Sequence, residues 1–249
     1  MTSTWFLSQL QMQQPGFWLL VSWLIGLAGV MGLRIWPGLA SWANWLAPLR
    51  WLIVPYVGLL VGALSPRHMG LSEIDWLAGA GWGMGLILAL LGLLWLIQSG
   101  DPNLHRSRAA LKEPGPASYV VLMSGLQEFH WAFLRGGLWS LLRTLDGASA
   151  GMVGGVPASF LAQPAYWAIW IAGVLAVIEL LVAGSVRRIG PTDGLIQLFV
   201  LLASSVLFLY TRNFWLCWLL HAGVRLLLAR SFTARSLPPQ SPPTAPRTE

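Results

Sequence analysis

The chain has 249 residues, of which 56% are hydrophobic and only 10% are charged. An average soluble domain carries about 25% charged residues, so this composition excludes an ordinary soluble domain and predicts a polytopic α-helical membrane protein. The formal net charge is +6. The basic residues are spread over loops and a tail, without a basic stripe or an RNA-binding motif. This distribution argues against a nucleic-acid partner and favours contact with anionic lipid headgroups.

Apolar stretches of about 20 residues, the length that crosses a bilayer, recur along almost the whole chain. They begin after residues 1–16, which contain no Lys or Arg and therefore do not form a signal peptide. The predicted spans are residues 17–36, 46–64, 76–98, 118–142, 161–184, 194–210 and 213–230. The expected fold is an all-α bundle of about seven transmembrane helices in one domain, residues 17–230.

The segments between and after these spans have simpler interpretations. Residues 37–45 (PGLASWANW) predict a short interfacial helix before the second span. A tight turn at Thr211–Asn213 joins the last two spans. Residues 231–249 are rich in Pro, Ser and Thr and predict a disordered tail. His68 and His105 lie in polar loops, where we expect solvated imidazoles.

The basic residues predict the orientation in the membrane, because cytoplasmic loops carry an excess of Lys and Arg. With seven spans, one side holds Arg67, Arg143 and Arg212. The opposite side holds ten basic residues: Arg34, Arg50, Arg106, Arg108, Lys112, Arg187, Arg188, Arg230, Arg235 and Arg247. The ten-residue side is expected to be cytoplasmic, which places the N-terminus outside or in a lumen and the tail in the cytoplasm.

The fourth predicted span, residues 118–142, carries ionisable residues in its middle. A charge at mid-membrane depth costs about 2.5–3.5 kcal/mol on insertion scales, so such residues face the protein interior. Glu128 and Arg135 are seven residues apart and share a helix face, whereas His130 points elsewhere. The last span carries His221 and Arg225, which are four residues apart and also share a face. The fifth span carries one acid, Glu179.

Several motifs resemble the CAAX protease and bacteriocin-processing (CPBP) family, whose members are glutamic-type intramembrane endopeptidases. The turn LYTRNFW (209–215) and His221 resemble the end of that family's last two helices. LQEFHWAFLRGG (126–137) resembles its Glu-Glu-x-x-x-Arg-Gly helix, and SPRHMGLSEIDW (65–76) resembles the preceding loop. The similarity covers residues 60–230 approximately. It implies a membrane helix bundle in which a glutamate activates water while histidines place that water and stabilise the oxyanion.

The chain departs from the family pattern at five positions. Gln127 replaces the first of the paired glutamates, and Ala132 replaces the arginine four residues further on. Leu175 and Glu179 stand where the family's middle motif has its aromatic residue and its histidine, and Arg225 replaces the final asparagine. Glu128 and His221 match the pattern clearly.

Three interpretations of these residues stay open. A structural charge network would balance Glu128 and Glu179 with Arg135 and Arg225. A reduced catalytic dyad would consist of Glu128 and His221. A third possibility is a pocket for a ligand or pigment, and His130 itself is interpreted as a packed or lipid-proximal histidine.

Metal and cofactor chemistry is not favoured. The single cysteine, Cys217, lies in an apolar stretch, which excludes a disulfide within the chain and a cysteine-rich metal site. A zinc site of Glu128, His130 and His221 is disfavoured because side chains two positions apart on a helix diverge. We therefore expect neither a metal ion nor a cofactor.

The function expected from this pattern is that of a divergent, catalytically impaired CPBP-like protein. It would act as a scaffold or regulator of other integral membrane proteins, through its Gly-rich and Trp-rich faces and its Pro-rich tail. The alternative is an active intramembrane endopeptidase that uses Glu128 and His221. The expected partners are membrane proteins or membrane peptides and the lipid bilayer.

Overall fold

The computed structural model describes residues 11–35, 40–100, 116–147, 162–187 and 191–233. These residues form helices and contain no strand, so the predicted all-α class is confirmed for the described part of the chain. The helices, in chain order, are α2 (Pro15–Ile35), α3 (Ala40–Leu60), α4 (Trp76–Gly100), α6 (Ala117–Gly147), α8 (Pro164–Arg187), α9 (Pro191–Thr211) and α10 (Phe214–Thr233).

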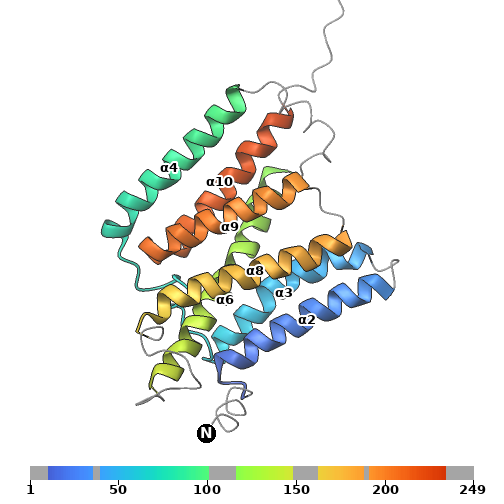
Figure 1. Ribbon diagram of the computed structural model, residues 1–249, viewed down its shortest axis with the longest axis vertical. Helices are drawn as coiled ribbons and strands as arrows, with labels where there is room; N and C mark the ends of the chain where they lie inside the picture. Colours follow the sequence, from blue (N-terminus) through green and yellow to red (C-terminus); the bar gives the residue numbers. More distant parts are fainter. Residues whose placement is uncertain (1–10, 36–39, 101–115, 148–161, 188–190, 234–249) are drawn as a thin grey trace, which may run out of the picture.

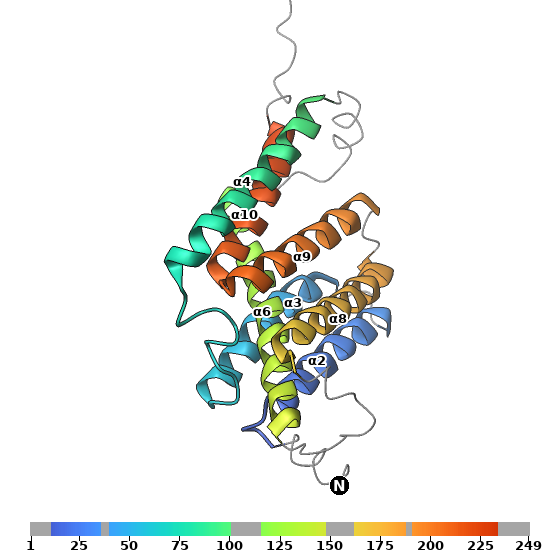
Figure 2. The same ribbon diagram turned by 60° about the vertical axis from the view of Figure 1, so that its left-hand side comes forward.

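Helix α6 runs through the middle of the bundle, and the other helices lie around it (Figures 1 and 2). It contacts α2, α3, α8 and α10. Helix α4 lies at the outer edge, against α9 and α10. The central part of α6 is accordingly the most enclosed segment, with Ala132, Phe133 and Leu134 fully buried. The helix that carries the ionisable residues is therefore the one that its neighbours enclose.

Four helices contain stretches long and apolar enough to cross a membrane: α2, residues 79–97 of α4, residues 164–184 of α8 and residues 193–211 of α9. The apolar stretches of α3 and α10 are shorter, Trp45–Leu60 and Phe214–Leu228. Many large apolar side chains point outward, such as Leu77 and Trp82 on α4. This outer surface suits lipid, and the chain is a membrane protein, as its composition predicts.

The second predicted span needs correction at both ends. Residues 40–45, which we assigned to a separate interfacial helix, form the first turn of α3, and residues 36–39 lie outside the described part. The helix ends at Leu60 rather than at residue 64. The reason is Gly62, whose φ of 74° closes the helix with a Schellman motif, in which Ala63 N–H donates to Gly58 O at 3.0 Å.

The loop after α3 packs back onto the bundle. Met69 is fully buried, and its side chain packs against Gly136 of α6, where any other residue would fill the same space. Gly70 adopts a φ of 71° and accepts a hydrogen bond from Phe214 N–H at 3.0 Å. The loop is thereby joined to the first residue of α10.

The predicted turn between the last two helices is confirmed, since α9 ends at Thr211 and α10 begins at Phe214. Arg212 adopts a φ of 46°, an uncommon conformation for a residue other than glycine. Asn213 is the N-cap of α10, because its Oδ1 accepts hydrogen bonds from the Trp215 and Leu216 N–H groups at 2.9 and 3.3 Å. The Asn in LYTRNFW therefore has a local structural role.

Candidate functional site

Glu128 and Arg135 form a buried ion pair on one face of α6. Arg135 Nη1 donates to Glu128 Oε1 at 2.8 Å, as their seven-residue spacing predicts. Helix α9 supplies further acceptors, because Arg135 Nη2 lies 2.8 Å from Ser204 Oγ and 3.4 Å from Ser205 Oγ. Glu128 is fully buried and Arg135 is 2% exposed. The two charges are thus neutralised and hydrogen-bonded inside the protein, as a buried pair requires.

His221 of α10 approaches the same carboxylate. Its Nδ1 lies 3.4 Å from Glu128 Oε2, so the structure brings the predicted dyad together. The imidazole stacks on Trp131, with ring centroids 5.1 Å apart and planes 16° from parallel. Its Nε2 is buried and has no hydrogen-bond partner among the described residues. The dyad is enclosed, since neither Glu128 nor His221 has exposed surface.

Glu179 belongs to a second cluster, which joins α3, α6 and α8. Arg50 of α3 donates to Glu179 through both terminal nitrogens, at 3.3 and 2.9 Å. His130 Nε2 lies 2.8 Å from Glu179 Oε2. The expected network of two acids with Arg135 and Arg225 therefore needs correction, because the arginine that contacts Glu179 is Arg50.

Two further neighbours fix Arg50 in this position. Its Nη1 donates to the Ser22 carbonyl of α2 at 3.0 Å. The guanidinium also lies over Gly26, where any side chain would overlap Nη1. Arg50 was missed because we placed it near the start of a span, at the cytoplasmic edge. A helix that begins at Ala40 carries it further into the bundle.

Arg225 contacts the residue beside Glu128. Its Nη2 donates to Gln127 Oε1 at 3.3 Å, while its buried Nε has no partner among the described residues. The amide of Gln127 and the guanidinium of Arg225 are therefore in direct contact. His130 is packed, as expected, but it is also bonded to Glu179 and is 1% exposed.

A cavity of about 500 Å³ borders the second cluster. Its walls come from α2, α3, α6 and α8 and are mainly apolar. Its polar lining consists of Arg50, Gln127, His130 and Glu179, whereas Glu128 and His221 do not line it. The cavity therefore gives access to the Arg50–Glu179–His130 cluster and not to the predicted dyad.

His68, which we expected to be solvated, is half-buried. The imidazole stacks on Trp139 of α6, with centroids 4.5 Å apart, and its Nδ1 lies 2.7 Å from Ser140 Oγ. Burial, together with the positive charges of Arg143, Arg67 and Arg212, holds the pKa of His68 below its ordinary value of 6.5. His105 lies outside the described residues. Within the described part, no three His, Cys, Asp or Glu side chains gather as a metal site requires.

Comparison with family models, with curated proteins and with solved structures found no match to this chain.

A double-mutant cycle should assign the partner of Glu179. We expect Glu179→Gln and Arg50→Gln to couple by about 1 kcal/mol or more, because the two side chains are in direct contact. The matched pair Glu179→Gln and Arg225→Gln should be additive within about 0.5 kcal/mol. The measurement is the thermal midpoint and denaturant stability of the detergent-purified protein. Coupling to Arg225 with additivity at Arg50 would contradict the pairing seen here.

Stability should fall as the pH drops through 6.5, partly because of His68. The unfolded chain protonates this imidazole below its ordinary pKa of 6.5, whereas the folded protein keeps it neutral to lower pH. We therefore expect a smaller loss of thermal midpoint between about pH 7.5 and about pH 5.5 in His68→Gln than in the wild type. An identical pH dependence in the two proteins would argue against a depressed pKa.

Proposed function

We propose that this chain is a divergent CPBP-like membrane protein that is impaired as a peptidase and acts as a scaffold or regulator of other integral membrane proteins. The observation that carries the first half is the closure of Glu128. Arg135 occupies one carboxylate oxygen at 2.8 Å, and His221 faces the other at 3.4 Å. The carboxylate has no exposed surface. A general base must reach a water and a substrate, and this geometry supports neither contact.

A second candidate, the active endopeptidase, is favoured by one observation. Glu128 and His221 come from helices far apart in sequence, yet their side chains lie side by side. Peptide hydrolysis at this dyad would require α10 to move away from α6 and Arg135 to leave the carboxylate. The experiment below separates this candidate from the scaffold.

The proposal includes seven crossings, with the N-terminus outside and the tail in the cytoplasm. Support for this orientation comes from the three arginines on the side of the bundle with fewer basic residues. Arg67, Arg143 and Arg212 all surround His68, so they lie at one end of the bundle. With Arg50 moved into the interior, the sequence leaves nine basic residues for the opposite side against these three. By the positive-inside rule, this excess of basic residues still favours a cytoplasmic location for the side with nine.

The outer face of α4 is the surface that best fits a membrane partner. Gly81 and Gly85 have no neighbouring atoms where a side chain would stand, although Gly83 between them packs on Leu216. Glycines four residues apart allow a second transmembrane helix to approach closely. Leu88, seven residues after Gly81, is 64% exposed on the same side of the helix. An edge helix with this pattern can accept a neighbour without rearrangement of the bundle.

Both halves of the proposal can be tested on the full chain. The wild-type protein and the Glu128→Gln variant are each reconstituted and incubated with transmembrane peptides. We expect the same products from both, because no cleavage should depend on Glu128. Cleavage by the wild type that is lost in a folded Glu128→Gln variant would establish the endopeptidase instead.

The scaffold half requires a partner at α4. A photo-crosslinking residue at position 88 should link to a defined membrane protein in native membranes. The link should be lost when Gly81 and Gly85 are both changed to Leu, because these side chains would hold the partner helix away. The matched control is Gly173→Leu on α8, where a side chain also meets no neighbour. Links to lipid alone would contradict this half of the proposal.

A further inference from the structure

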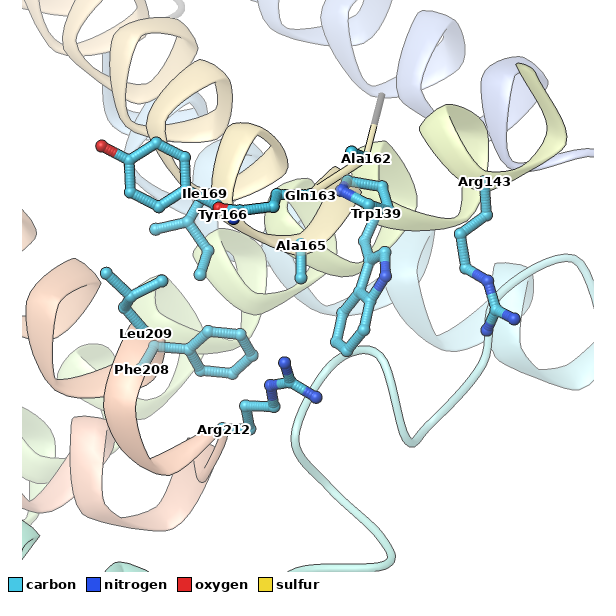
Figure 3. Close-up of a pocket in the computed structure, with 11 residues that line it drawn as sticks. Trp139, Arg143, Ala162, Gln163, Ala165, Tyr166, Ile169, Phe208, Leu209 and Arg212 are labelled. Atoms are coloured by element: carbon cyan, nitrogen blue, oxygen red, sulfur yellow. The ribbon is translucent and has the colours of Figure 1, made fainter. Parts of the chain in front are cut away.

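A second cavity, of about 480 Å³, lies at the end of the bundle where α6 ends and α8 begins (Figure 3). Its floor is apolar and includes Ile169, Phe208 and Leu209. Its rim carries Trp139 and two arginines, Arg143 and Arg212. This volume falls in the range of small-molecule sites, about 300–1,000 Å³, and is far larger than a single ion needs. The cavity thus combines an apolar floor with a cationic rim.

The two rim arginines have no carboxylate partner among the described side chains. Arg143 Nη1 lies 3.5 Å from His68 Nε2, and the Arg212 guanidinium lies over the ring of Trp139, 5.0 Å from its centroid. Arg67, at the same end of the bundle, is different because it pairs with Glu73 at 3.1 Å. None of the described residues that line the cavity is acidic. The two rim arginines therefore form no ion pair with a described carboxylate.

The structure holds Arg212 in place rather than leaving it on a free loop. Its backbone N–H donates to Phe208 O at 2.8 Å, and its carbonyl packs against Gly70. The next residue, Asn213, is fixed as the N-cap of α10. Trp139, which the guanidinium covers, is itself stacked on His68. A cation held in this way loses little conformational freedom when it binds an anion.

The first turn of α8 adds to the same potential. Gln163, just before the helix, and Pro164, Ala165 and Tyr166 in its first turn line the cavity. The first N–H groups of a helix lack partners within the helix, and this end carries a partial positive charge. The helix start therefore reinforces the preference for an anion that the two arginines create.

We propose that this cavity binds the phosphate group of an amphiphile, with the phosphate at Arg143 and Arg212 and an apolar chain on the Ile169–Phe208–Leu209 floor. Guanidinium groups match the oxygens of a phosphate through paired hydrogen bonds. The arginines and the apolar residues line the same cavity, so one molecule can contact both. Because a free phosphate shares the headgroup chemistry, the test distinguishes the two sources. The proposal does not depend on the state of Glu128.

Ligand-induced stabilisation of the full purified chain tests this site. The probes are short-chain phosphatidic acid, phosphatidylcholine with the same chains, and inorganic phosphate. Phosphatidic acid should raise the thermal midpoint in a saturable manner, and phosphatidylcholine at the same concentration should not. A shift with inorganic phosphate as large as that with phosphatidic acid would show that the site takes the free ion and would overturn the amphiphile. No shift with either phosphate compound would overturn the site.

The variants localise the effect. Arg143→Gln with Arg212→Gln should weaken phosphatidic acid binding about tenfold or more, since two charge-assisted hydrogen-bonding groups are lost. Arg67→Gln is the matched control and should bind as the wild type does. Ala165→Phe leaves both arginines intact but fills the cavity, so it should also abolish the shift. Equal losses in Arg67→Gln, or full binding in a folded Ala165→Phe variant, would contradict the proposal.

Discussion

The ion pair between Glu128 and Arg135 constrains the rest of the bundle. Two charges at membrane depth are tolerated only when they are paired and their remaining hydrogen-bonding groups are satisfied. Helix α6 holds both charges, so the middle of this helix must be covered. Helix α9 brings the serine hydroxyls of Ser204 and Ser205, and α10 brings His221. The central position of α6 follows from this requirement.

The polar groups of the protein fall into two kinds of environment. Inside the bundle, the acids and the cations beside them satisfy one another, which leaves Glu128 without access to water or substrate. At the loop end, Arg143 and Arg212 border a cavity and form no ion pair with a described carboxylate. The interior therefore supports a structural role, whereas the end of the bundle has unused capacity to bind an anion.

The sequence predicted the features that depend on local spacing. The apolar stretches located the helices, the seven-residue interval joined Glu128 to Arg135, and the turn before Asn213 was found from its residues. The contacts between distant segments could not be found in this way. Arg50 and Glu179 are 129 residues apart, and their meeting depends on where α3 begins and on the space that Gly26 leaves. His68 lies in a polar loop, and its partial burial depends on how that loop folds onto α6.

The most direct test of a structural interior is the stability of Glu128→Met, Arg135→Met and the double variant in detergent. Each single change leaves one buried charge without its partner, so each should cost about 3–5 kcal/mol. The double variant removes both charges and should be more stable than either single variant, because apolar side chains of similar size replace the pair. Single variants as stable as the wild type, or a double variant that shows the sum of the two losses, would contradict the account.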